Sequence, residues 1–425
     1  MPAGRMRQRG AAALTVVMVL FFIMALVAGY SSRNLIFEQK TSANTYRATQ
    51  AMEAAEASIE WAITMLNGGR ITATCTPSAN NGDNTFRERY LTLMDDGHVD
   101  FRRWMKNGVE APLVAGCVRG AAGLVCSCPT AADPTLVAPA QQPAPAYALA
   151  FENADAPGTV RILAAGCSFI GSDGRQCLGV PSGSVSDTDA DAVSQIIGQV
   201  ALVRALPAPP VAALTAGNRI QAAGVLEVSN VDPKTGITVR SATSVVAATP
   251  RYVLPAGTPG DGKVTDDAAL LSLVAADRLF VSLFAMDRAT FRRQPAAVRV
   301  DCPQSCGGDR LATAVANNPG RVIWVQGDID LDQDGALGSA AQPTMVLVDG
   351  RATLSAQVVL TGLLHARNVD WNATPGSAVI GAVVAEGDFI ATTDARVAYD
   401  AAVLDLIRRG HGSYVRVPGS WWDKK

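Results

Sequence analysis

The stretch from Ala11 to Ser32 contains no charged residue and no histidine. An apolar run of this length can cross the hydrocarbon core of a bilayer, which takes about 20 helical residues. Three arginines precede it at positions 5, 7 and 9, so we expect the N-terminus on the cytoplasmic side and the rest of the chain on the other side. A cleaved secretory signal peptide would have a shorter apolar core, of about 7–15 residues. The sequence therefore predicts a membrane-spanning helix over residues 11–32.

The same helix is expected to continue beyond the membrane, because no Pro or Gly interrupts residues 32–66. This segment is rich in Ala, Glu, Gln and Met, which are good helix formers. Its apolar residues recur at helical spacing, for example at Ala55, Ile59 and Ala62. Asn67-Gly68-Gly69 is a typical C-terminal stop. We predict one long N-terminal helix within residues 11–69.

The N-terminal part of the chain carries a family resemblance. A short basic segment that ends in Gly10, followed by a small residue and an uninterrupted apolar helix, resembles the start of a type IV prepilin. Further along, Glu38-Gln39-Lys40, Asn44, Arg47 and the block QAMEAAEA at 50–57 are similar to the signature of PilX-type minor pilins. In that signature E-x-K/R, N, R and A-x-E-A-A-E-A recur along the helix.

The resemblance implies how the N-terminus is processed. Residues 1–10 would be a prepilin leader, which prepilin peptidase removes by cutting between Gly10 and Ala11. Ala11 would then be the new, N-methylated terminus, and Thr15 would be residue 5 of the mature chain. Major pilins carry at that position a Glu that pairs with the terminal amine of a neighbouring subunit in the filament. The lack of this acid suits a priming or tip subunit.

The resemblance also implies a function and its partners. The protein would be a minor pilin of type IV pilus assembly that helps to prime or cap the filament. It would sit in the bacterial inner membrane as a single-pass protein with a periplasmic C-terminal domain, and later in the pilus. Its partners would be other minor and major pilins, prepilin peptidase, the inner-membrane assembly platform and membrane lipid.

Two alternatives to this function stay open. One is the large minor pseudopilin of a type II secretion system, which also lacks the Glu at mature position 5. The other is a pilus-tip adhesin or carbohydrate-binding protein that the helix displays. A nucleic-acid partner is not expected, since the formal net charge is −2.

Composition indicates that the remainder of the chain is β-rich, which makes the fold class α+β. Charged residues are only 17% of the chain, while there are 38 Gly and 23 Pro, a mixture that suits a turn-rich β protein. We predict a pilin-like, Cys-containing head over residues 70–205. Within it, residues 85–105 have a helix-like pattern, and strand-like runs occupy residues 147–165 and 192–205.

Residues 206–425 are predicted to form a second β-rich domain with a helical insertion near 266–293. Strand-like runs such as VIWVQGDIDL and MVLVDGRATL recur there every 20-odd residues and lead into Gly-containing turns. Such a repeat suggests stacked, solenoid-like rungs. A sandwich with meander connections is the alternative.

The eight cysteines are an even number in a region expected to be exported. Cys167 and Cys177, and likewise Cys302 and Cys306, lie close enough in sequence to close small loops. We expect disulfides, because thiols beyond the membrane are in an oxidising compartment. A structural metal is disfavoured, since the only close pair besides these is a CxC.

Asp330, Asp332 and Asp334, with Gly335 after them, have the D-x-D-x-D-G spacing of a calcium loop, and Asp328 could add a ligand. Ala341 stands where an EF-hand requires Glu, so an Asp-rich turn with solvated side chains is the simpler alternative. No cofactor other than this calcium ion is expected. The sequence has three histidines and no nucleophile elbow, P-loop or HExxH motif, so we expect no enzyme.

Overall fold

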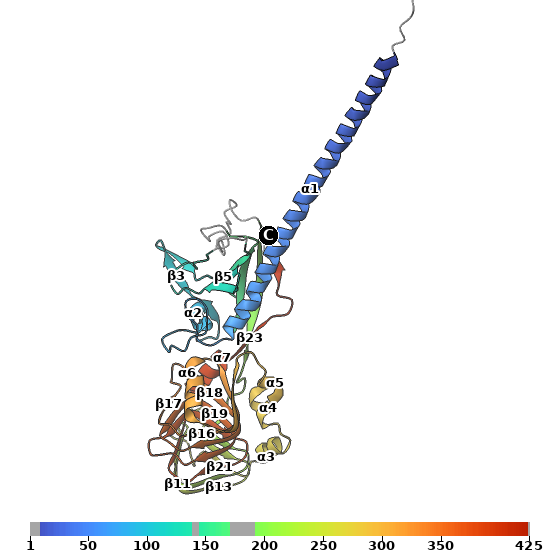
Figure 1. The fold of residues 1–425 in the computed structure, drawn as a ribbon. Helices are drawn as coiled ribbons and strands as arrows, with labels where there is room; N and C mark the ends of the chain where they lie inside the picture. The colour runs from blue at the N-terminus through green and yellow to red at the C-terminus, as the bar shows by residue number, and fades with distance from the viewer. Residues whose placement is uncertain (1–8, 138–143, 171–191, 424–425) are drawn as a thin grey trace, which may run out of the picture.

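A computed structural model describes residues 9–137, 144–170 and 192–423, and its parts follow one another in space as a stem, a head and a solenoid (Figure 1). The stem is the first half of one long helix, which projects from the head. The head and the solenoid are both β-rich, so the predicted α+β class with a long N-terminal helix is confirmed. The described helices are α1 (Arg9–Leu66), α2 (Phe86–Tyr90), α3 (Ala268–Ala275), α4 (Leu279–Phe284), α5 (Arg288–Phe291), α6 (Gly308–Asn317) and α7 (Ala401–Gly410).

The head is an antiparallel sheet that packs on the second half of α1. Its spatial order is β23-β9-β8-β7-β5-β6, with β24 also paired to β9. Two hairpins, β1–β2 and β3–β4, lie beside it. The head strands are β1 (Leu91–Leu93), β2 (Val99–Phe101), β3 (Arg103–Lys106), β4 (Val109–Pro112), β5 (Ala115–Gly120), β6 (Gly123–Ser127), β7 (Ala146–Asn153), β8 (Thr159–Cys167), β9 (Val193–Arg204), β23 (Gly412–Arg416) and β24 (Trp422–Asp423).

Small residues let α1 lie close to the head sheet. Ala51, Ala55 and Ile59 are fully buried on the face of α1 that meets β7, β8 and β9. On β8, a Cβ built on Gly166 would lie 2.1 Å from the carbonyl oxygen of Ala51. On β9, one built on Gly198 would lie 3.1 Å from Cδ1 of Ile59. Glycine at these two positions therefore sets the distance between helix and sheet.

The C-terminal strands form a solenoid in which every strand pair is parallel. Its strands are β10 (Ala212–Ala216), β11 (Ile220–Ser229), β12 (Ile237–Ser241), β13 (Val245–Val253), β14 (Lys263–Val264), β15 (Ala297–Gly307), β16 (Val322–Leu331), β17 (Gly335–Leu337), β18 (Thr344–Leu354), β19 (Val358–Trp371), β20 (Ala378–Ala385), β21 (Phe389–Ala391) and β22 (Ala395–Tyr399). The predicted solenoid-like rungs are thus confirmed, and the sandwich alternative is wrong.

The rungs do not stack in chain order. From the head outward, β15, β16, β18, β19 and β20 follow one another, and then come β10, β12 and β14. The chain therefore enters the solenoid in its middle, builds the end far from the head, and returns along one side through α3, α4 and α5 (Figure 1). These three helices lie within the range expected for the helical insertion.

Both faces of the solenoid wall are buried near the head. On β16, Ile323 and Val325 point into the solenoid core, whereas Trp324 packs outward among residues of α4, α5 and α7. Phe280 and Phe291 contact Trp324 with ring centroids 6.0 Å apart in each case. A wall covered on both sides accounts for the unbroken apolar run VIWV, which alternation alone would not produce.

Two sequence-based boundaries need correction. The second β domain was expected to run to residue 425, but β23 and β24 pair with β9 of the head. The helix-like pattern at 85–105 is helical only in α2, which a capping box between Thr85 and Glu88 begins. The chain then turns at Asp95–Gly97 between β1 and β2, because a hairpin lets Leu91 and Val99 reach the head core.

Candidate functional site

The exposed half of α1 is the most unusual surface of the protein. Every residue from Ala13 to Thr49 is exposed, including large apolar side chains such as Phe21, Phe22 and Phe37. By length and hydropathy, this is the one described helix that could cross a membrane. Exposed apolar area on this scale requires lipid or partner helices around it. The predicted cleavage site, Gly10 and Ala11, lies in the first turn of the same helix.

Disulfides close loops of the head and bridge an irregularity within β15 of the solenoid. Cys75 pairs with Cys128, and Cys117 pairs with Cys126 across neighbouring strands. In the solenoid, the expected Cys302–Cys306 bridge is present. Cys167 is also disulfide-bonded, while Cys177 lies outside the described residues.

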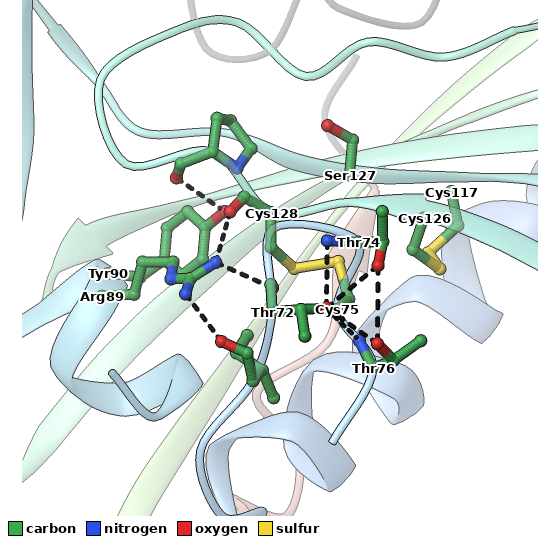
Figure 2. Close-up of a disulfide and its surroundings, with 12 residues drawn as sticks. Thr72, Thr74, Cys75, Thr76, Arg89, Tyr90, Cys117, Cys126, Ser127 and Cys128 are labelled. Carbon is green, nitrogen blue, oxygen red and sulfur yellow. Dashed lines mark hydrogen bonds between the residues drawn. A yellow bond between two sulfur atoms is a disulfide. The ribbon is translucent and has the colours of Figure 1, made fainter. Parts of the chain in front are cut away.

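The Cys75–Cys128 bridge lies beside a buried arginine, as Figure 2 shows. The guanidinium of Arg89 donates to the carbonyls of Ile71, Thr72 and Cys128, at 2.8, 2.9 and 2.6 Å. Spacing in the sequence did not reveal this pairing, because Cys75 and Cys128 are 53 residues apart.

The four aspartates of the predicted calcium loop do not converge on one point. Each accepts a hydrogen bond from a different neighbour: Asp328 from the Arg351 amide, Asp330 from the Ser355 hydroxyl, Asp332 from the Gly308 amide and Asp334 from the Gln357 amide. Among the described residues, no group of three or more acidic, His or Cys side chains could hold a metal ion. The calcium prediction is therefore corrected: three of these carboxylates bond to the following turn of chain, and Asp332 bonds to the preceding one.

The head and the solenoid meet at a junction whose polar side chains are buried or partly buried. On the head side of this junction, Asn67, just after α1, donates to the Tyr414 carbonyl of β23 and accepts from the Tyr414 amide, at 2.8 Å each. The guanidinium of Arg87 donates to the carbonyls of Leu66, Gly410 and Gly412 at 2.9 to 3.1 Å. Arg87 thus caps the C-terminal ends of both α1 and α7, where carbonyl groups lack helical partners.

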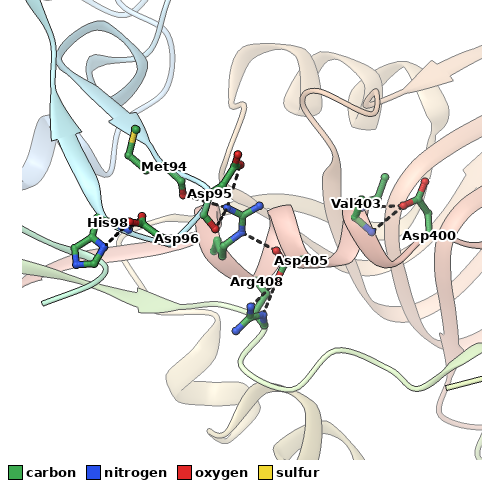
Figure 3. A network of polar contacts seen from close by, with 10 residues as sticks. Met94, Asp95, Asp96, His98, Asp400, Val403, Asp405 and Arg408 are labelled. Atoms are coloured by element: carbon green, nitrogen blue, oxygen red, sulfur yellow. Dashed lines mark hydrogen bonds and ion pairs between the residues drawn. The ribbon is translucent and has the colours of Figure 1, made fainter. Parts of the chain in front are cut away.

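Arg409, near the end of α7, extends the junction to the first hairpin of the head. Figure 3 shows Met94 and Asp95 of that hairpin beside Asp405 of α7. Arg409 donates to the Met94 carbonyl at 3.1 Å and the Asp95 carbonyl at 2.9 Å. It also pairs with Asp405 one turn earlier in α7, at 2.7 Å. The junction therefore links the stem helix, the head hairpin and the last solenoid helix through side chains that lie far apart in the sequence.

A second ionic cluster fastens the helical insertion to the solenoid wall. Glu386 accepts from Arg288 and lies 3.1 Å from Nε2 of the buried His365 and 3.2 Å from Arg367. Burial opposes ionisation of Glu386, but its contacts with His365 and Arg288 lower its pKa to about 2. Charges are balanced in this cluster, since Asp349 also faces Arg288 and Arg367, at 3.6 and 3.7 Å.

His411 makes the junction sensitive to acid. Burial, and then the neighbouring charge of Arg87, lower the pKa of His411 to about 4, while the Pro343 carbonyl weakly opposes this shift. His411 therefore takes up a proton near pH 6.5 in the unfolded chain but only near pH 4 in the folded chain. The free energy of unfolding thus falls as the pH drops through this window. We expect a loss of about 2 kcal/mol in the free energy of unfolding between pH 7 and pH 5.

Denaturant midpoints of the full chain in detergent, measured at several pH values, check this expectation. His411→Asn should flatten the profile between pH 7 and pH 5. The titration of Glu386 does not interfere, because the stability that its low pKa confers is lost only below about pH 4.5. An unchanged pH profile in His411→Asn would show that another group controls acid stability.

Comparison with known proteins bears on the stem. Residues 9–60 match the family model described as PilX N-terminal, so the resemblance seen in the sequence is confirmed for this segment. The N-terminal helix is thus similar to that of PilX-type pilins. No curated protein matches the chain.

Two solved structures share a weak likeness with this chain. The competence-associated pilin ComZ from Thermus thermophilus is 11% identical, with 89% of this chain and 98% of that one covered and a TM-score of 0.23. A domain of an ice-binding protein from Shewanella frigidimarina is 13% identical, with 46% of this chain and 98% of that one covered and a TM-score of 0.21.

Proposed function

We propose that the protein is a minor pilin of type IV pilus assembly that helps to prime or cap the filament. The observation that carries the proposal is the stem: a PilX-type helix whose residues from Ala13 to Thr49 are exposed and largely apolar. Such a helix is stable in a bilayer or in a bundle with similar helices. The mechanism is assembly rather than catalysis, and the chain would pass from the inner membrane, with its head in the periplasm, into the pilus.

The position of the solenoid supports a terminal place in the filament. It lies beyond the head, on the side away from the projecting stem (Figure 1). A subunit stacked on that side would have to occupy the same volume. A place at the tip avoids this conflict, since no subunit precedes it there. The proposed partners are therefore other minor pilins, and major pilins on the stem side only.

The role of Gly10 is directly testable. We expect Gly10→Val to block removal of the leader by prepilin peptidase, because a branched side chain would then stand at the cleaved bond. The chain should keep its leader and lack N-methylation at Ala11, which mass spectrometry of the membrane fraction measures. Pili per cell should fall. Gly4→Val, within the same leader, is the matched control and should be processed normally. Normal shortening and piliation of Gly10→Val would contradict the prepilin interpretation.

Deletion of the gene separates this proposal from the pseudopilin alternative. A pilus subunit predicts loss of pili with unchanged enzyme secretion, and a pseudopilin predicts the reverse. Co-purification from detergent extracts of cells then identifies the partners, with minor pilins expected.

A further inference from the structure

A cavity of about 290 Å³ lies where the head meets the solenoid. It opens between the loop after α1, the end of α6 and the turn that precedes β18. Its polar and charged lining includes Arg70, Arg321, His411, Asn81, Gln342 and Thr344. This volume is at the lower end of the range for small-molecule sites.

The lining carries positive charge without acids to balance it. No aspartate or glutamate is among the described residues that line the cavity. In the described part of the chain, neither Arg70 nor Arg321 takes part in any ion pair. Arg70 donates to the carbonyls of Ala316 and Asp83, and Arg321 donates to Asn318 and the Pro295 carbonyl. Both guanidiniums are thus held in place by neutral acceptors, which leaves their charge uncompensated.

Polar atoms in the same place lack partners. The ring of His411 is buried, since the residue is only 3% exposed. The Pro343 carbonyl lies near it, but neither ring nitrogen makes a hydrogen bond of acceptable geometry. Nε of Arg321 is likewise buried without a partner. Buried donors are normally satisfied, and an unsatisfied one costs free energy. The ring nitrogens of His365 in the cluster around Glu386 also lack a hydrogen bond of acceptable geometry, but Nε2 of His365 lies 3.1 Å from the Glu386 carboxylate. Charges in that cluster are therefore paired internally, whereas no acid is among the described residues that line the cavity.

We propose that this junction cavity binds a small anionic sugar, which presents a carboxylate or phosphate to Arg70, Arg321 and His411. Arginine is suited to both groups, because its planar fork of donors matches either oxyanion. The neutral amides and hydroxyls of Asn81, Gln342 and Thr344 supply partners for ring hydroxyls. A second cavity of about 180 Å³ shares His411 and Gln342 with the first, and Leu93, Leu202 and Tyr414 line it. It offers an apolar surface for one face of the ring, while Glu88, which also lines it, accepts a hydrogen bond from the Gln342 amide at 2.8 Å.

The sugar site and the assembly role are independent of each other. If the protein is a pilus subunit without a sugar site, the titration with sugars will show no binding. If it binds sugar but has no role in pili, Gly10→Val will leave piliation unchanged. Gly10→Val tests the assembly role, and titration with sugars tests the site.

The test is isothermal titration of the full chain in detergent with glucuronate, glucose 6-phosphate and glucose. We expect saturable binding of at least one of the two acidic sugars with a Kd below about 1 mM, and much weaker binding of glucose. Comparison of glucuronate with glucose 6-phosphate shows whether the site prefers a carboxylate or a phosphate. Absence of saturable binding of both acids up to about 10 mM, or equal binding of glucose, would overturn the proposal.

Variants locate the site. Arg321→Gln should weaken binding by about tenfold or more, because a charge-assisted hydrogen bond is lost. Arg396→Gln is its matched control, since Arg396 is an exposed arginine that pairs with Glu227 elsewhere on the solenoid. Equal loss in both would contradict the assignment to this cavity.

Arg321→Gln could also lose binding because the protein misfolds, so a second pair of variants tests the same cavity at exposed positions. Ala312 lies on an exposed position of α6 and lines the cavity, so Ala312→Glu adds a repelling charge without disturbing the core. Thr313→Glu adds the same charge at the next exposed residue, which does not line the cavity. We expect Ala312→Glu to abolish binding and Thr313→Glu to retain it. Unchanged binding in Ala312→Glu would overturn the proposal.

Discussion

Gly166→Ala is expected to destabilise the head by about 3 kcal/mol or more. The added carbon would lie 2.1 Å from the Ala51 carbonyl oxygen and 2.3 Å from the Ala55 amide nitrogen. Both are backbone atoms of α1, so relief requires the whole helix to move away from the sheet. Overpacking that side chains can absorb costs about 1–3 kcal/mol, and this clash has no side chain to absorb it. Chemical denaturation of the full chain in detergent measures the loss.

Two other glycines provide a graded control. A Cβ at Gly198 would meet Cδ1 of Ile59 at 3.1 Å, which is the flexible end of a side chain, so Gly198→Ala should cost less. At Gly82, in an exposed loop, the nearest atom is a side-chain oxygen of Asn80 at 3.4 Å, and Gly82→Ala should have little effect. If the three variants were equally stable, the close approach of α1 to the sheet would be refuted.

Arg87→Met is expected to loosen the junction between head and solenoid, at a cost of about 3 kcal/mol or more. The change keeps the apolar part of the side chain but leaves the carbonyls of Leu66, Gly410 and Gly412 without their donor in a partly buried place. It also removes the guanidinium from the ring of Tyr414, now 4.7 Å away. Hydrogen exchange should rise at the ends of α1 and α7, which Arg87 caps together.

Arg416→Met is the matched control. Arg416 pairs with Glu60 at 3.4 Å across the exposed edge of the head, and such surface pairs contribute about 1 kcal/mol at most. Its removal should leave exchange at α7 unchanged. Equal protection of α7 in Arg87→Met and in the unaltered protein would show that apolar packing alone holds the junction.

Local patterns in the sequence were sufficient for the stem. The absence of charge, the helical spacing and the Asn67-Gly68-Gly69 stop are all features of consecutive residues, and α1 ends at Leu66 as they indicate. The capping box at Thr85 was equally local, but it begins a helix of only five residues. The hairpin after that helix depends on where Leu91 and Val99 can be buried, which tertiary packing decides.

Rung order and the junction were beyond the reach of such patterns. The regular recurrence of strand-like runs indicated rungs, yet nothing in β10 specifies β20 as its neighbour. The role of Arg87 depends on two helix ends, at Leu66 and Gly410, that only the fold brings together. The cavity is hidden for the same reason, since its charged lining forms a group only after both domains have folded. The calcium prediction was wrong because the D-x-D-x-D-G spacing does not show which neighbouring turn of the solenoid each carboxylate contacts.

The rung order also determines when each strand can pair during synthesis of the chain. Synthesis releases β10 and β11 first, but their partners β20, β21 and β22 emerge only near the end of the chain. Until then, one edge of each early strand stays unpaired and open to aggregation. The head waits even longer, because β23 and β24 complete its sheet on β9 from the final residues of the chain. A product that stops before β20 therefore lacks both a closed head and a continuous solenoid, and one that stops between β22 and β23 still lacks the strands that complete the head sheet.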